Sequence, residues 1–251
     1  MSASLLKIAS FADRLLNISK IHDYPDAYNG LQVENNGTVK KIAAATDAHE
    51  AVLRKAVQAG ADLLVTHHGM FWGKPLPLTG ANFRKIQWCV KNNLAVYSAH
   101  LPLDMHPMIG NNAILAKKLS LKKTKPFFES HGNLIGRMGE LRMHRDDLVR
   151  RIESVTGHRA RLIAGGPGKT RRVGIVSGGA GELEPALEVG LDTYITGEGA
   201  HHTFGQAIEY GINLIYAGHY ATETFGIQAL AQTLSKKFRV PWTFMDVPSG
   251  I

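Results

Sequence analysis

Residues 42–69 read IAAATDAHEAVLRKAVQAGADLLVTHHG: an apolar run, a stretch with helical spacing, and a second apolar run. Residues 173–199 read VGIVSGGAGELEPALEVGLDTYITGEG and repeat this order. The pair Gly60-x-Asp62 in the first stretch corresponds to Gly190-x-Asp192 in the second. Each stretch is typical of strand, helix, glycine turn and strand. The sequence therefore predicts two related α/β lobes.

The same alternation continues outward from these stretches. Strands are predicted near 42–46, 62–66, 94–99, 133–142, 161–164, 172–177, 192–196, 212–217 and 239–245, and helices near 3–18, 49–59, 81–92, 111–119, 146–156, 182–189, 201–210 and 222–236. Such alternation favours an α/β fold with mostly parallel sheets. Lys122 to Pro126 resembles a linker, so we expect one lobe at 1–125 and another at 126–251, with the C-terminal segment returning to the functional site.

Two adjacent histidines end the apolar run at 62–66. His67 and His68 therefore belong at the carboxyl end of a strand, the edge at which open α/β sheets bind ligands. Neutral imidazole is the commonest metal ligand in proteins. Taken alone, the pair fits a hydrogen-bonded loop equally well.

Two further strands end in similar residues. The run at 94–99 is followed by His100 and Asp104, and the run at 212–217 is followed by His219 and Glu223. Both pairs have the spacing His-x-x-x-carboxylate, and His219 and Glu223 can share one face of the helix predicted at 222–236 if that helix begins early. Three strand ends thus carry groups that suit a divalent cation, and we expect the site at the strand ends between the lobes.

These ends supply nitrogen and carboxylate oxygen but no sulfur. The candidate ligands are His67, His68, Asp104, His219 and Glu223. Such a set suits Zn, Fe, Mn, Ni or Co better than Ca. Five protein ligands exceed what one catalytic metal usually takes, whereas two ions sharing a bridging carboxylate would use all five. We therefore expect two divalent ions per subunit.

Glu198 and His100 are the candidate catalytic residues. Glu198 occupies the position in the second repeat that His68 occupies in the first, so it is expected to face the site. A general acid–base role or a role in orienting a metal ligand fits it, as does an ordinary surface position. His100 has the same alternatives.

The composition of the chain favours some cellular locations over others. The chain has 251 residues, of which 44% are hydrophobic, and it contains no apolar run long enough to span a membrane. The first twenty residues have the spacing of an amphipathic helix rather than of a signal peptide. The single cysteine, Cys89, lies in an apolar segment and is expected in the core. A reducing, cytoplasmic location fits these features.

The formal net charge of +8 favours anionic partners. The densest basic cluster lies at 117–125, and no aromatic residues interleave with its lysines as a base-stacking platform requires.

Two glycine-rich segments have the look of anion-binding loops. Gly165 to Thr170 lacks the spacing of a phosphate-binding loop and precedes a predicted strand. Gly178 to Gly181 could hold an anion before a helix, although a tight connection explains such glycines as well.

Several motifs together resemble the GTP cyclohydrolase I type 2 family, also called the NGG-interacting-factor-like family. They are Asn29-Gly30-Leu31-Gln32-Val33, Thr66-His67-His68-Gly69, Ser98-Ala99-His100-Leu101-Pro102-Leu103-Asp104, Thr196-Gly197-Glu198 and Gly218-His219-Tyr220-Ala221-Thr222-Glu223. The resemblance runs from about residue 20 to the C-terminus. It implies a dinuclear metal centre on the five ligands named above and a ring-shaped homohexamer.

The resemblance also implies a hydrolase that converts GTP to dihydroneopterin triphosphate, with a nucleotide as the small-molecule partner. Two alternatives stay open, because fold alone does not fix function. One is a non-enzymatic metal-binding hexamer that stores or delivers metal or serves as an interaction partner. The other is a metal-dependent phosphoester hydrolase on nucleic acid, which would need a basic track leading to the metals.

Overall fold

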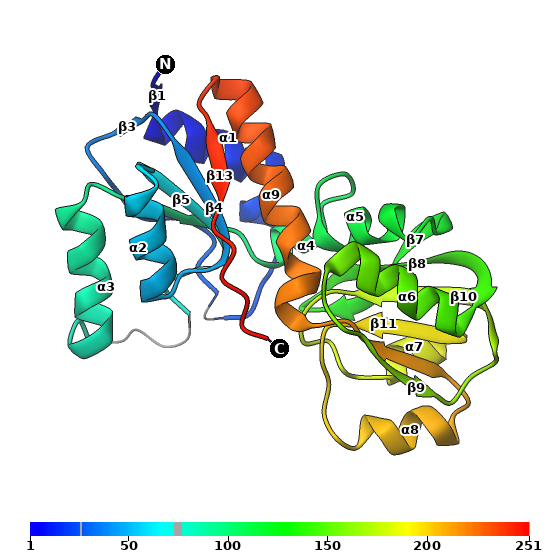
Figure 1. Ribbon diagram of the computed structural model, residues 1–251. Coiled ribbons are helices and arrows are strands. Elements are labelled where there is room, and N and C mark those ends of the chain that lie inside the picture. Colours follow the sequence, from blue (N-terminus) through cyan, green and yellow to red (C-terminus); the bar gives the residue numbers. More distant parts are fainter. Residues whose placement is uncertain (26, 73–76, 251) are drawn as a thin grey trace. The chain divides into compact units, whose positions relative to one another are not determined.

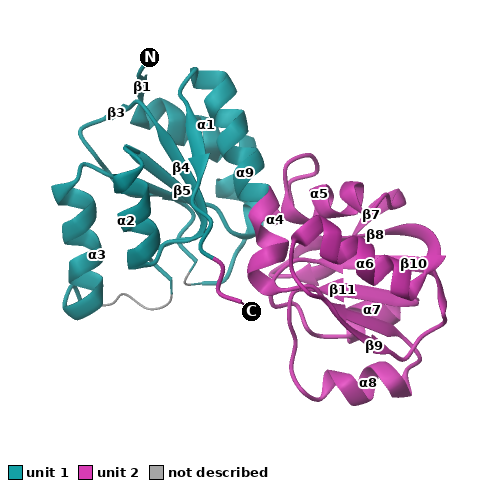
Figure 2. Ribbon diagram, in the orientation of Figure 1, with its two compact units in different colours: residues 1–103, 226–247 teal, residues 104–225, 248–251 magenta. Residues whose placement is uncertain are grey.

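The computed structural model describes residues 1–25, 27–72 and 77–250 (Figure 1). Pro75, Pro77 and Gly80 predict a loop after the twin histidines, and Pro75 lies outside the described residues. The chain divides into two compact units (Figure 2). Unit 1 comprises residues 1–103 and 226–247, and unit 2 comprises residues 104–225 and 248–251.

This division differs from the one expected at 125/126. The supposed linker forms the start of strand β7, Lys122–Ser130, which pairs antiparallel with strand β8, Asn133–His144. Lysines and a proline look like linker composition, but they are equally typical of an exposed edge strand. Residues 226–247 were expected in the second lobe but belong to unit 1, and the return of the C-terminal segment to the functional site stays a prediction.

Unit 1 is built on a sheet with the strand order β13-β4-β5-β6-β2. Its elements are β1 (Ala3–Ser4), α1 (Leu5–Leu16), a 3-10 turn at Ile18–Lys20, β2 (Gly30–Val33), β3 (Thr38–Val39), β4 (Ile42–Asp47), α2 (Glu50–Gln58), β5 (Leu63–His68), α3 (Gly80–Lys91), β6 (Ala95–Ser98) and β13 (Trp242–Phe244). Neighbours from β13 to β6 are parallel, and β2 joins β6 antiparallel. Strands β1 and β3 form a separate antiparallel pair.

Both faces of this sheet are covered, which explains its continuous apolar strands. Ala43, Leu64 and Val96 pack with α2 and with Cys89 of α3. Tyr97 points to the opposite face, where its hydroxyl donates to Asp13 Oδ1 of α1 at 2.9 Å. Because Cys89 is fully buried in this core, its predicted core position is confirmed.

Unit 2 contains a sheet with the order β7-β8-β10-β11-β12-β9. Besides β7 and β8, its elements are α5 (Asn111–Lys118), α6 (Arg145–Thr156), β9 (Arg161–Ala164), β10 (Lys169–Val176), α7 (Glu184–Glu188), β11 (Thr193–Thr196), α8 (Thr203–Glu209) and β12 (Asn213–Tyr216). The neighbours β10, β11 and β12 are parallel, and the outer strands are antiparallel. The α/β class is confirmed, with the parallel part of this sheet confined to its centre.

The internal repeat is visible in matching hydrogen bonds. Asp62 accepts from the backbone N–H groups of Lys40 and Lys41, at 2.7 and 3.0 Å. Asp192 accepts from those of Arg171 and Arg172, at 2.9 and 2.7 Å. The aspartate after the glycine turn thus fixes the residues just before β4 in unit 1 and residues within β10 in unit 2.

Two helices carry the chain between the units. Helix α4, Leu101–Asp104, ends at the first residue of unit 2, and helix α9, His219–Phe238, begins in unit 2 and ends in unit 1. Helix α9 begins three residues earlier than predicted, so that His219 is its first residue. Within the described part of the chain, no helix has the length and apolar character needed to cross a membrane.

Candidate metal centre

Three histidines gather at the carboxyl end of the sheet in unit 1. His67 and His68 end β5, and His100 follows β6, its parallel neighbour. One ring nitrogen from each lies within 4.8 Å of the other two. His67 and His100 are buried, and His68 is partly exposed. The predicted pair is therefore joined by a third imidazole.

Each of these rings is oriented through its Nδ1 atom. His67 Nδ1 lies 3.0 Å from the carbonyl oxygen of Ala99, and His68 Nδ1 lies 2.8 Å from Asp47 Oδ1. His100 Nδ1 lies 2.8 Å from Asp23 Oδ1. A carbonyl or carboxylate oxygen can only accept, so Nδ1 carries the hydrogen when the ring is neutral and Nε2 carries the lone pair. This tautomer suits metal binding through Nε2.

Asp23 is itself held on several sides. Its Oδ2 accepts from the Asn29 side chain at 2.8 Å and from the backbone N–H of Leu101 at 3.0 Å, while Asn29 accepts from the backbone N–H of His100. Burial acts to raise the pKa of Asp23, but hydrogen bonding and charge from His100, with further donors, lower it below its ordinary value. Asp23 is thus an ionised acceptor that fixes the His100 ring.

Unit 2 gathers the remaining candidate ligands. His219 Nε2 lies 3.2 Å from Glu223 Oε2 across one turn of α9, and the carboxyl groups of Asp104 and Glu223 have oxygens within 4.8 Å of each other. Asp104 and Glu223 are both buried. Asp104 Oδ1 accepts from Asn111 Nδ2 at 2.8 Å and from Ser177 Oγ at 3.2 Å.

Glu198 is linked to the candidate ligands of unit 2 by its contact with His219. Its Oε1 lies 2.8 Å from His219 Nδ1, and its side chain is half exposed. Burial alone would lower the pKa of His219, but hydrogen bonds and charges from Glu223 and Glu198 raise it to about 9. An imidazole held between two carboxylates marks a place where positive charge is stabilised.

The glycine run at 178–181 makes room for this cluster. Gly178 has φ +73°, and a Cβ there would stand 2.2 Å from Glu223 Oε1. Its carbonyl oxygen accepts from the backbone N–H groups of Gly197 and Glu198, and helix α7 begins only at Glu184. These glycines therefore serve close chain approach rather than an anion site at a helix end.

The sequence did not point to Asp23, Asp47, Asn111 or Ser177. Asp47 is the last residue of β4 and lies opposite His68 in the parallel register, so the rule used for the other strand ends could have found it. Asp23 lies in an irregular segment that carries no periodic signal. Its contact with His100 spans 77 positions along the chain.

The fold and these groups define an α/β protein whose histidines and carboxylates could bind metal ions. The model of the family Duf34/NIF3 (NGG1p interacting factor 3) matches residues 3–249, and the chain belongs to that family. The chain is 42% identical over 236 residues to a Deinococcus radiodurans protein named GTP cyclohydrolase 1 type 2 homolog, with 92% of this chain and 90% of that protein covered.

Solved structures agree with this assignment. The protein TTHA1606 from Thermus thermophilus superposes with a TM-score of 0.90 at 38% identity, covering 99% of this chain and 100% of that one. The protein ybgI, described as of unknown function, gives a TM-score of 0.92 at 34% identity, with the same coverage. The resemblance expected from the motifs is confirmed.

Proposed function

We propose that this protein is a dinuclear metal-dependent hydrolase that acts on a nucleotide, with the conversion of GTP to dihydroneopterin triphosphate as its reaction. The main support for metal dependence is that the histidines share one orientation. His68, His100 and His219 each direct Nδ1 at a carboxylate, and His67 directs it at a carbonyl oxygen. The names of the curated relatives support the specific reaction.

The donor chemistry fits first-row divalent ions. The proposed ligands supply imidazole nitrogen and carboxylate oxygen: His67, His68, Asp104, His219 and Glu223. Glu223 is the proposed bridging ligand, since within unit 2 its carboxylate lies near both Asp104 and His219. Two ions sharing one carboxylate are a common arrangement in hydrolytic sites.

The reaction requires addition of water at C8 of the guanine ring and delivery of protons to the nitrogen atoms released. Bound divalent ions supply Lewis-acid activation of the water. Glu198 is proposed to hold and transfer protons, because its half-exposed side chain can exchange them with solvent. His100, fixed by Asp23, is the second candidate for proton transfer.

A screen of nucleotides tests the proposal. Protein reconstituted with Zn, Mn, Fe, Co or Ni is incubated with a nucleotide panel, while pterin absorbance, formate and phosphate release are followed beside the Glu223→Ala variant. We expect turnover of GTP by the reconstituted protein and none by the variant. Metal-loaded protein that leaves every nucleotide unchanged would instead support a metal storage, delivery or interaction role.

We also propose a homohexameric assembly, as the family resemblance implies. Helix α8 offers apolar surface for such an assembly, because Phe204 and Ile208, one turn apart, are each about half exposed. Tyr210, the residue after the helix, is also exposed, at 60%. Sedimentation at micromolar concentration tests the assembly, and a monomer would contradict it.

A further inference from the structure

Two neighbouring surface pockets of unit 2 are rich in basic side chains. The first, of about 560 Å³, is lined by Arg142, Met143, His144, Lys169, Thr170 and Arg171. The second, of about 280 Å³, is lined by Lys123, Lys125, Met138, Gly139, Glu140, Arg171 and Arg172. Arg171 lines both, so the pockets form one surface over β7, β8 and β10, called the basic track below.

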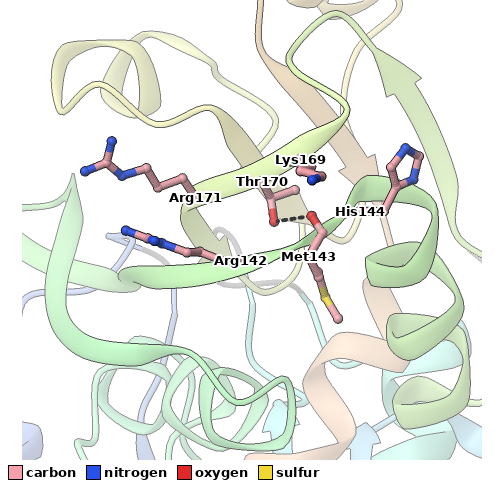
Figure 3. Close-up of a pocket in the computed structure, with 6 residues that line it drawn as sticks. All are labelled: Arg142, Met143, His144, Lys169, Thr170 and Arg171. Atoms are coloured by element: carbon pink, nitrogen blue, oxygen red, sulfur yellow. Dashed lines mark hydrogen bonds between the residues drawn. The ribbon is translucent and has the colours of Figure 1, made fainter.

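The sheet geometry creates this track. Strands β8 and β10 are antiparallel, with Lys169 opposite His144, and their register shifts between Thr170 and Arg172. Thr170 anchors the irregular segment by donating to the carbonyl oxygen of Leu141 at 2.8 Å. Figure 3 shows the Arg142 and Arg171 side chains extending in the same direction from these neighbouring strands. Two guanidinium groups are thus presented together.

The track carries positive charge that the described residues do not neutralise. Arg142, Arg171, Lys169 and Lys125 are exposed and form no hydrogen bond or ion pair through their side chains with the described part of the chain. Glu140 is the one acidic residue in the described lining, and Lys123 binds it at 3.0 Å. The hydrogen bond from Lys123 and its positive charge lower the pKa of the Glu140 carboxyl group. The charges of Arg142 and Arg171 lower this pKa as well.

We propose that the basic track binds the phosphate backbone of a nucleic-acid duplex. Paired guanidinium groups suit phosphate oxygens, since their planar forks donate two hydrogen bonds at once. The track crosses three strands and two pockets, so it suits a repeating polyanion better than a single phosphate group. Its described lining has no Phe, Tyr or Trp on which unpaired bases could stack, which favours a duplex over a single strand.

This inference is independent of the metal-dependent reaction. None of the residues that line the track is a proposed metal ligand. The sequence pointed to the lysines at 117–125, but only Lys123 and Lys125 of that cluster line the track. The arginines at 142, 171 and 172 come from strands more distant along the chain.

Fluorescence anisotropy with a labelled DNA duplex of about 20 base pairs, at several salt concentrations, tests the proposal. The track variant replaces Arg142, Arg171 and Lys169 with Gln. Its control replaces the exposed Lys20, Lys40 and Lys91 of unit 1 with Gln and so loses the same charge. We expect the track variant to bind at least about tenfold more weakly and its log–log salt slope to fall by about 3, while the control stays near wild type.

A second variant, with Arg142→Lys and Arg171→Lys, keeps the positive charge of the track and should keep the wild-type salt slope. This result would show that the track variant binds weakly because it has lost charge and not because it is misfolded. Equal weakening in the track variant and its control would overturn the proposal. Absence of duplex binding by the wild type at low salt would overturn it as well. Binding of polyglutamate in place of the duplex would assign the track to an acidic protein, and altered sedimentation of the track variant would assign it to contacts between copies.

Discussion

His219 Nδ1 lies 2.8 Å from Glu198 Oε1, so the first residue of α9 is oriented by a carboxylate that follows β11. The same distance separates His68 Nδ1 from Asp47 and His100 Nδ1 from Asp23. Carboxylates that bind the outer nitrogen of a metal-ligating histidine fix its tautomer and raise its basicity. Glu198 therefore has a contact by which it can act without being a ligand.

Two replacements of Glu198 separate its possible roles. Glu198→Gln keeps an oxygen acceptor for His219 but cannot take up a proton, so metal content should stay unchanged while turnover falls by about 10²–10⁴-fold. Glu198→Ala also removes the acceptor and should weaken metal binding by about 10–100-fold. Metal titration and steady-state kinetics measure both effects. Unchanged turnover of Glu198→Gln on a verified substrate would exclude proton transfer by this residue.

Asp47 should control metal affinity through His68. Asp47→Ala removes the oxygen that holds His68 Nδ1, and we expect about 10–100-fold weaker metal binding. Asp47→Asn retains an acceptor and should restore most of the affinity. The exposed Asp146, replaced by Ala, provides a control for charge loss in unit 2. If Asp47→Ala and Asp146→Ala bind metal equally well, the orientation of His68 does not depend on Asp47.

Glu223 and Asp104 should differ in their effect on metal content. If Glu223 bridges two ions, Glu223→Ala should lose most of both, whereas Asp104→Ala should lose chiefly one. Elemental analysis after reconstitution and dialysis measures the stoichiometry, for which we expect two ions per wild-type subunit. A wild-type content of one ion at most, or equal losses in the two variants, would argue against the bridge.

Cys89 should be unreactive in the native protein. It is fully buried, and burial raises the pKa of its thiol to about 11. Since the thiolate is the reactive form, alkylation at pH 8 should be slow in the folded state and fast in denaturant. Its rate in the folded protein should rise as the pH approaches 11, provided that the fold persists. Rapid modification at pH 8 without denaturant would contradict the buried position.

The periodic parts of the fold could be read from the sequence because burial imposes a pattern on them. Both copies of the strand–helix–strand repeat are present, and the strand at 161–164 is found at the predicted residues. Strands β2 and β7 were missed, since each lies at the edge of its sheet and is only partly covered. An exposed edge strand needs no alternation of apolar residues.

The candidate ligands followed from one rule, that parallel strands end at the same edge of a sheet. The sequence by itself therefore predicted which imidazoles and carboxylates are candidate metal ligands. Only the tertiary structure decided what orients them, because Asp23 and His100 are 77 positions apart and no local pattern records their contact. It also decided the composition of the basic track, since the sheet places Arg142 beside Arg171 although helix α6 and strand β9 separate them along the chain. Strand pairing brings distant residues together, whereas sequence periodicity reports only on neighbours within one element.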